Sequence, residues 1–414
     1  MLCLLCAFQT ATALERTIDG IKYILLSEED KTVTVSGYTK IIPQQGHLKI
    51  KIPSKIAWSS DEHVPGGYGD SFTVATIAPR AFLGDTEILE VSFPKSIQHI
   101  GEKAFGGCAL ETLTIQHNIS FGDSAFAGCP NLTRVTILSP IRDWGTYAFG
   151  ECQKLDSVFL KDTVTTLGDY TFFRCNKLAS VTIPKSIEKW EPGTFMECAN
   201  LRSVTFMDGL TTLGSRAFSH CPSLRNVAIP ESITSWGDGV FQGCANLQFV
   251  KFWDGLKTIG NNAFRDCASF LVADWPKELE MIGNHAFDGC ASLYFATFPK
   301  SLRTIGSYAF ESCESLPSVT FPENSLTTLG DYAFHSCTSL DSVTLPGSLT
   351  TFGSHAFESC TSLSSITLPG SLTTLGDYAF HSCTSLPSIT LPGSLTTFGT
   401  HAFDSCTLLS SVTL

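Results

Sequence analysis

Apolar residues recur along this chain at a fixed interval. A phenylalanine, usually preceded by alanine, marks each repeat, and the sequence numbers of neighbouring marks differ by 23 except for one interval of 21 and one of 24. The marks are Phe82, Phe105, Phe126, Phe149, Phe172, Phe195, Phe218, Phe241, Phe264, Phe287, Phe310, Phe334, Phe357, Phe380 and Phe403. A cysteine follows three residues after each of them except the first, and this column holds fourteen of the sixteen cysteines. Such self-similarity indicates a repeat architecture.

One unit, residues 340–360, contains the elements that the pattern predicts. Residues 342–345 alternate polar and apolar side chains, as in a strand with one buried face, and Pro346 ends that strand because it cannot donate to a ladder. Gly353 is expected to allow a sharp turn. A short helical turn should follow, with Ala, Phe and Cys on its inward face. In three neighbouring units its N-cap is expected at Asp331, Ser354 and Asp377.

A unit this short cannot close a hydrophobic core of its own, so its copies must stack to bury their apolar columns. Stacked strands form one parallel sheet, with about 4.7–4.9 Å between neighbours. We therefore expect a β-rich α/β solenoid. It should curve into an arc, with the parallel β-sheet on the concave face and short helical or 3-10 turns on the opposite side.

The repeated motif resembles that of a known family. It reads Cys-x-x-Leu-x-x-Val-x-Leu-Pro-x-Ser-Leu-x-x-Leu/Phe-Gly-x-x-Ala-Phe and is similar to the BspA-like (Treponema pallidum type) leucine-rich repeat, from about residue 72 to 414. Residues 18–37 resemble the β-rich N-terminal cap that often precedes such arrays. The resemblance implies a surface or secreted protein, with adhesion to host matrix proteins or to other cells reported for several members.

These observations divide the chain into three parts. Residues 1–13 are an apolar run followed by Ala-Thr-Ala, which predicts a truncated signal peptide; the alternative is a disordered or buried N-terminus. Residues 14–70 are expected to form the β-rich cap, and residues 71–414 an array of about fifteen units. The last unit is incomplete at Leu414, which indicates either a longer natural chain or a partial gene model. No window reaches the roughly 18 apolar residues of a membrane span.

The charge distribution argues against binding to nucleic acid or to anionic lipid. The formal net charge is -12, and no lysine or arginine occurs after Arg303. Both classes of partner are bound through clustered basic side chains. We therefore expect no nucleic-acid partner.

The cysteine column invites a disulfide or a zinc interpretation. Neighbouring cysteines stand one turn apart with parallel side chains, whereas a disulfide needs side chains that face each other, and zinc needs four convergent ligands. Buried free thiols that act as small apolar side chains fit the spacing. No metal site and no cofactor are expected.

The histidines also recur with the repeat. They are interpreted as solvated surface residues, with a metal ladder beside carboxylates such as Asp377 as the alternative. Catalysis is not expected, because no serine, histidine or aspartate is unique in its setting, and Gly-x-Ser-x-Gly, Walker and His-Glu-x-x-His motifs are missing from the sequence. The histidines concerned are His335, His355, His381 and His401.

Positions that depart from the repeat carry more information about a partner than those that obey it. The outward strand positions are Ser or Thr in most units, but apolar and charged residues replace them in the middle of the array. Such a patch is typical of a binding site, although divergent packing alone would also explain it. The candidate partner-binding residues are Phe249, Lys251, Trp253, Asp274 and Phe295.

The sequence thus favours a non-catalytic recognition scaffold, secreted or at a cell surface, that binds a protein or glycan through its concave sheet. The partner is expected in the extracellular matrix or on another cell. Two alternatives remain: an intracellular scaffold for protein–protein interaction, and a structural spacer that carries a missing C-terminal region.

Overall fold

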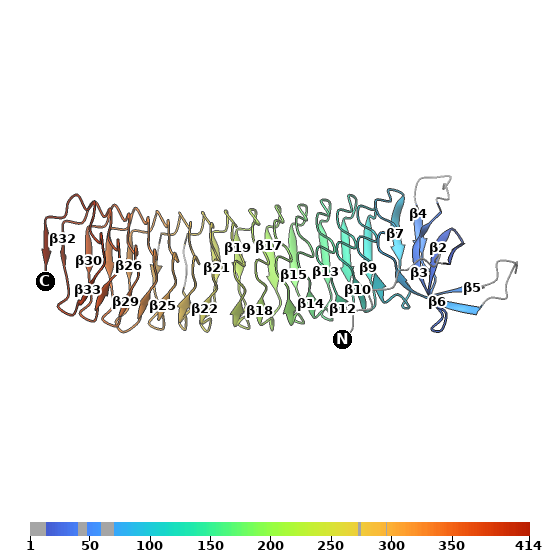
Figure 1. Ribbon diagram of the computed structural model, residues 1–414, viewed down its shortest axis with the longest axis horizontal. Coiled ribbons are helices and arrows are strands. Elements are labelled where there is room, and N and C mark those ends of the chain that lie inside the picture. The colour runs from blue at the N-terminus through green and yellow to red at the C-terminus, as the bar shows by residue number, and fades with distance from the viewer. Residues whose placement is uncertain (1–13, 40–47, 59–69, 272–274, 295) are drawn as a thin grey trace.

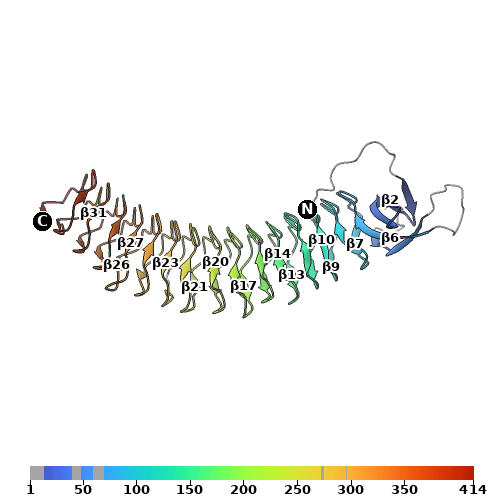
Figure 2. The same cartoon turned by 60° about the horizontal axis from the view of Figure 1, so that its bottom comes forward.

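Each repeat unit forms one turn of a parallel β-solenoid, and the turns stack along a single axis (Figure 1). This computed structural model describes residues 14–39, 48–58, 70–271, 275–294 and 296–414. Figure 2 shows that the stack bends gently along its length. The segment expected to be a signal peptide, residues 1–13, lies outside the described residues. Within those ranges there is no helix long and apolar enough to cross a membrane.

Most turns contribute two strands, where the sequence predicted one. The strand with the alternating Ser-Val-Thr pattern lies beside its equivalents in neighbouring turns and pairs with them in groups of two to four strands. We call this series the first ladder. It comprises β7 (Ile88–Ser92), β9 (Thr112–Ile115), β11 (Arg134–Ile137), β13 (Ser157–Leu160), β15 (Ser180–Ile183), β17 (Ser203–Phe206), β19 (Asn226–Ala228), β21 (Phe249–Lys251), β24 (Ala296–Thr297), β26 (Ser318–Thr320), β28 (Ser342–Thr344), β30 (Ser365–Thr367), β32 (Ser388–Thr390) and β34 (Ser411–Thr413).

A shorter strand follows later in each turn and builds the second ladder, which is also parallel. It comprises β8 (His99–Ile100), β10 (Ile119–Phe121), β12 (Ile141–Asp143), β14 (Thr166–Leu167), β16 (Lys189–Trp190), β18 (Thr212–Leu213), β20 (Ser235–Trp236), β22 (Thr258–Ile259), β23 (Met281–Ile282), β25 (Thr304–Ile305), β27 (Thr328–Leu329), β29 (Thr351–Phe352), β31 (Thr374–Leu375) and β33 (Thr397–Phe398).

The N-terminal strands pair with the first turn of both ladders. They are β1 (Glu15–Ile18), β2 (Ile21–Ser27), β3 (Thr32–Tyr38), β4 (Leu48–Lys51), β5 (Lys55–Trp58) and β6 (Asp70–Ile77). Strands β1 to β3 are antiparallel, β3 runs parallel to β6, and β6 pairs with β8 of the second ladder. Strand β5 pairs with β6, and β4 pairs with β7 of the first ladder. The N-terminal strands therefore cover the first strand of each ladder, whose outer edge would otherwise present unpaired backbone groups.

The expected helical turns are not formed, so the α/β part of the predicted fold class is wrong. The described residues contain no helix. The segment between the second ladder and the cysteine is a run of tight turns with left-handed residues, such as Tyr332 at φ 56° and Ser336 at φ 58°. The Phe334 N–H donates to the Ala356 carbonyl of the next turn, at 2.9 Å. In an α-helix each of these N–H groups would donate to a carbonyl four residues earlier in the same segment. Here they donate to the next turn instead, so the segment cannot be helical.

The residues expected to cap and turn those helices have other roles. The carboxylate of Asp331 accepts a hydrogen bond from the Ser354 N–H of the next turn at 2.8 Å, so it joins two turns and caps no helix. Gly353 does not have a left-handed backbone. A Cβ there would lie 2.4 Å from the carbonyl carbon of Gly330, so glycine is needed because the two turns approach so closely.

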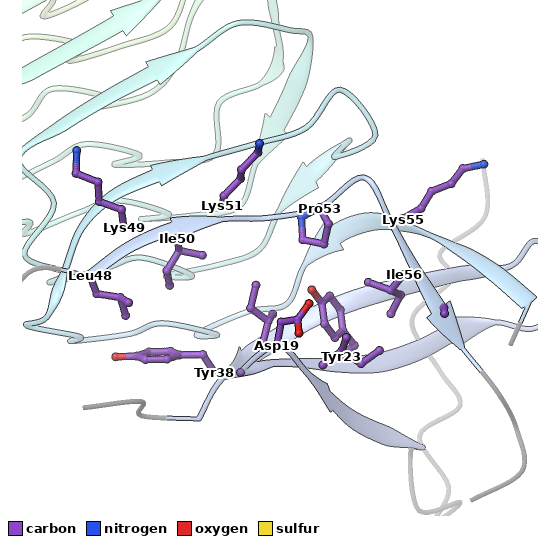
Figure 3. A pocket seen from close by; sticks show the side chains of 14 residues that line it. Asp19, Tyr23, Tyr38, Leu48, Lys49, Ile50, Lys51, Pro53, Lys55 and Ile56 are labelled. Carbon is purple, nitrogen blue, oxygen red and sulfur yellow. The ribbon is translucent and has the colours of Figure 1, made fainter. Parts of the chain in front are cut away.

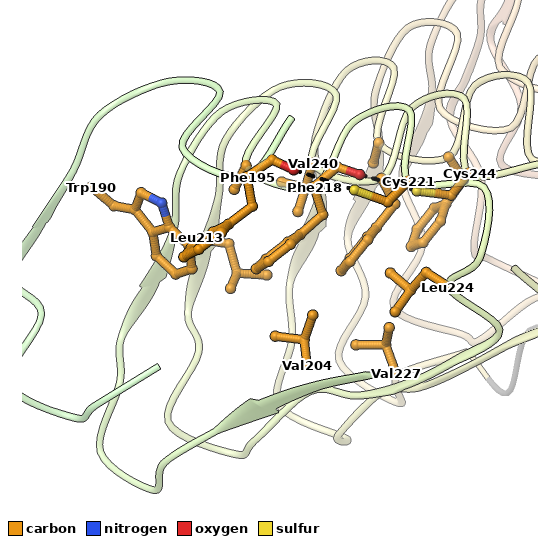
Figure 4. Packing of buried hydrophobic residues seen from close by; sticks show 14 of the residues in the cluster. Trp190, Phe195, Val204, Leu213, Phe218, Cys221, Leu224, Val227, Val240 and Cys244 are labelled. Carbon is orange, nitrogen blue, oxygen red and sulfur yellow. Dashed lines mark hydrogen bonds between the residues drawn. The ribbon is translucent and has the colours of Figure 1, made fainter. Parts of the chain in front are cut away.

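The core is a set of columns that run the length of the array. Rings of the phenylalanine column stack, with Phe310 and Phe334 centroids 5.2 Å apart and 4° between ring planes. Figure 4 shows Val204 and Val227 directed toward such rings. All fourteen repeat cysteines are free thiols and thirteen are buried, which confirms that part of the prediction.

Candidate functional site

The first ladder presents an aromatic ring to solvent at β21. Strand β21 pairs with β19, so that Phe249 lies beside Asn226 and Lys251 beside Ala228. Alternation along the strand buries Val250 and leaves Phe249 47% exposed. Serine occupies the equivalent position in many turns, as the register of the paired strands shows. An exposed ring on a ladder that is otherwise rich in hydroxyl groups makes β21 a candidate contact surface.

A hollow of 1030 Å³ opens beside Lys251, where strands of the first ladder end. Apolar side chains of the hollow include Phe252 and Trp253. Carboxylates from four turns also line it, namely Asp208, Glu231, Asp254 and Glu278. We call this depression the central hollow.

The position of Trp253 in the central hollow is fixed by two contacts. Its indole N–H donates to the carbonyl oxygen of Ile233 in the preceding turn, at 2.8 Å. Its ring lies across Gly255, where a Cβ would be only 1.9 Å from the indole Cζ3 atom. Indole rings that are held in one place bind partners well, because little side-chain entropy is lost.

The central hollow carries unbalanced negative charge. Asp254 forms an ion pair with Lys277. For Asp208, Glu231 and Glu278 there is no ion-pair partner among the residues that the structure describes. Lys251 also lines the hollow, so four carboxylates stand against Lys251 and Lys277, and the remaining negative charge favours a cationic group on whatever enters the hollow.

The structure brings together three of the five predicted site residues. Phe249 and Lys251 project from one strand, and Trp253 lies just beyond its end. Asp274 and Phe295 lie outside the described residues. The neighbouring Tyr294 is 64% exposed, two turns along from Phe249.

Sequence reasoning missed the carboxylates of the central hollow, because each is an ordinary surface residue when taken alone. A signal for the hollow was nevertheless present. Pro230 and Pro276 occupy one position of the repeat, whereas Met207 and Trp253 replace that proline and are followed by Asp-Gly. The two replacements mark the turns that border the hollow.

A second cavity, of 420 Å³, lies among the N-terminal strands (Figure 3). Leu48 and Ile50 of β4 point toward its interior, while Lys49 and Lys51 point away. Burial raises the pKa of Tyr23, which lines the cavity, to about 12. The lining combines apolar side chains with charged ones, among them Asp19, whose charge also contributes to the raised pKa of Tyr23.

Comparisons with known proteins agree with this architecture. The chain matches the BspA type leucine rich repeat region over residues 71–179, 166–294, 257–360 and 280–410. A leucine-rich repeat protein from Bacteroides ovatus is 28% identical; the alignment covers 96% of this chain and 94% of that one, with a TM-score of 0.54. No curated protein matches the chain.

Two further solved structures are similar with lower scores. A leucine rich cell surface protein from Faecalibacterium prausnitzii is 23% identical over 97% of this chain and 95% of that one, with a TM-score of 0.48. The pneumococcal vaccine antigen PcpA is 20% identical over 95% and 90%, also with a TM-score of 0.48. The repeat match spans most of the array and the stacked turns carry its motif, so this chain belongs to the BspA-type leucine-rich-repeat family.

Proposed function

We propose that this protein is a non-catalytic recognition scaffold that binds a protein partner on the first ladder, over β21 and the central hollow. The observation that carries this proposal is the exposed ring of Phe249 beside a hollow in which Trp253 is held in place. Aromatic side chains next to a depression supply most of the contact energy in many interfaces. The surrounding Ser and Thr hydroxyls provide a polar rim.

The charge of the central hollow indicates the chemistry of the partner. Asp208, Glu231 and Glu278 have no described ion-pair partner, so a lysine or arginine side chain that enters the hollow would meet three carboxylates and the face of Trp253. Carboxylates and an indole face both favour a cation. A basic segment of a protein fits this surface better than a neutral glycan does, and a glycan is the second outcome to be tested.

The proposed location is a cell surface or the extracellular space. Its support is the apolar N-terminal segment followed by Ala-Thr-Ala. N-terminal sequencing of the mature protein tests it, because cleavage would place the first residue near Leu14. An uncleaved start at Met1 in the producing cell would favour the intracellular scaffold.

The binding proposal is tested by capture of extracellular proteins and glycans on the full chain, compared with two variants. Phe249→Ser restores the residue that many other turns carry, and Trp253→Pro restores the residue found at 230 and 276. Each should weaken capture about tenfold or more, since central aromatic residues contribute about 2 kcal/mol or more.

A matched control is Phe159→Ser, which removes a ring that is 53% exposed on β13 of the same ladder, four turns before β21 and outside the lining of the hollow. It should leave capture unchanged. Equal capture by the wild-type chain, Phe249→Ser and Trp253→Pro would contradict the proposal.

A further inference from the structure

A strip of histidines and carboxylates follows the tight turns through the last third of the array. Two columns build it. Histidine and tyrosine rings, which occupy left-handed positions two residues before the phenylalanine, stack on one another with centroids 4.2 to 4.8 Å apart. The column comprises His285, Tyr308, Tyr332, His355, Tyr378 and His401.

The residue directly after each phenylalanine forms the second column, and it contacts the first. This charged column comprises Arg265, Asp288, Glu311, His335, Glu358, His381 and Asp404. His335 Nδ1 lies 3.1 Å from Glu311, and His381 Nδ1 lies 3.0 Å from Glu358. The histidines expected to be merely solvated thus bind carboxylates, and His335 and His381 are half-buried.

Three donor groups of the strip converge at one point. His285 Nδ1 lies 3.0 Å from Asp288 Oδ2, and one oxygen of Glu311 from the next turn completes a group whose donor atoms are all within 4.8 Å of one another. Ligands of a tetrahedral zinc ion, at bond lengths of about 2.1 Å, are about 3.4 Å apart. His285 Nδ1 and Asp288 Oδ2 now share a hydrogen bond at 3.0 Å, so they would separate slightly as an ion replaces that bond. Glu311 would move closer and exchange its contact with His335 for one with the ion.

The ring of His285 is held in place for such a role. It stacks on Tyr308 with the centroids 4.6 Å apart and 5° between the planes. Asp288 is 8% exposed, so its carboxylate is also restrained. Ligands restrained in this way lose little entropy when an ion binds.

The electrostatic environment also favours a cation. Glu311 and every later carboxylate stand in a part of the chain that has no lysine or arginine. One fixed cation, Arg265, reaches the site, with Nε 3.2 Å from Asp288 Oδ2. We infer that His285, Asp288 and Glu311 bind a divalent metal ion of the zinc class, with Arg265 as a competing cation.

The test is calorimetric titration of zinc chloride into the metal-free full chain. One ion should bind per chain. Asp288→Asn and Glu311→Gln keep the shape of each side chain but remove a charged ligand, so each should weaken zinc binding at least about tenfold, because even outer-shell changes cost that much. Arg265→Gln should tighten binding several-fold, since it removes the competing charge.

A matched control exists in the same strip. His401 and Asp404 repeat the His-Ala-Phe-Asp sequence of the site, but no third donor joins them among the described residues. Asp404→Asn should therefore leave zinc binding unchanged. An equal loss in this control, or unchanged binding in both Asp288→Asn and Glu311→Gln, would overturn the assignment.

Cobalt substitution gives an answer that does not depend on any variant. Nitrogen and oxygen ligands should give a cobalt spectrum that lacks a sulfur-to-cobalt charge-transfer band. Such a band in the folded protein would mean that the ion is held by the cysteine column, and it would refute the inference.

Discussion

The thiol of Cys221 donates a hydrogen bond to the carbonyl oxygen of Phe195 in the preceding turn, with 3.3 Å between sulfur and oxygen (Figure 4). The same bond recurs for every repeat cysteine, at 2.8 to 3.4 Å. The cysteine column therefore joins neighbouring turns as well as filling space. A weak donor that is otherwise apolar suits a site with one carbonyl and no water.

Replacing Cys221 by alanine should lower the free energy of unfolding by about 1–3 kcal/mol, because a hydrogen bond is lost and a small cavity remains. The urea midpoint measures the effect. Thr361→Ala is a matched control, since it removes a hydroxyl from an exposed bond between turns and should change the midpoint little. A midpoint for Cys221→Ala equal to that of the wild-type chain would show that the thiol bond contributes nothing.

The buried thiols should make the fold sensitive to alkali. Burial raises the pKa of Cys198 and of Cys244 from 9.0 to about 12, because the thiolate is poorly solvated there. The folded state then holds these protons more tightly than the unfolded state does. Stability is complete below about pH 9 and falls as the pH rises toward 12, by about 1.4 kcal/mol per pH unit for each such thiol.

Circular dichroism between pH 8 and 11, read together with thiolate absorbance, checks this expectation. Loss of the β signal should coincide with the appearance of thiolate. Cys244→Ala removes one such thiol, so the unfolding free energy should fall less steeply with pH, by about 1.4 kcal/mol per pH unit. Thiolate formation in a chain that keeps its full β signal would contradict the expected link.

A side chain at Gly353 should destabilise the stack of turns. Gly353→Ala would place a Cβ 2.4 Å from the backbone of Gly330, and backbone cannot move aside as a flexible side chain can. We expect a loss of about 2 kcal/mol or more in unfolding free energy. Gly370→Ala is the matched control, because no atom lies within 4 Å of its added Cβ. Thermal unfolding of the two variants should separate them clearly, and equal melting temperatures would argue against close packing of the turns.

The repeat period predicted the stack of turns because only stacking buries the phenylalanine and the cysteine of every unit. It did not predict the second ladder, because strands of two residues such as Thr351–Phe352 are too short to show alternation. The helical turns were predicted from cap residues such as Asp331. A carboxylate accepts any nearby N–H, and here the N–H belongs to the next turn.

The candidate site was predicted only where a residue departed from the repeat. Phe249 and Trp253 stand out because many other units carry serine at the first position and the two neighbouring units carry proline at the second. The carboxylates of the central hollow do not stand out, because their importance depends on the shape formed by several turns together. The convergence of Glu311 with His285 was likewise hidden, because they belong to different turns and only the stacking brings them together.

Alternation in the histidine strip bears on how this gene can change in length. Residues 325–368 and 371–414 differ at only six aligned positions, so a block of two units has been copied. In the charged column, copies of this block place a histidine in the turn between two turns that carry carboxylates, as His335 lies between Glu311 and Glu358. Loss of the unit that carries His335 would bring Glu311 and Glu358 into adjacent turns without the histidine that now contacts both. Gain or loss of two units at a time therefore keeps histidine and carboxylate alternating in this part of the column.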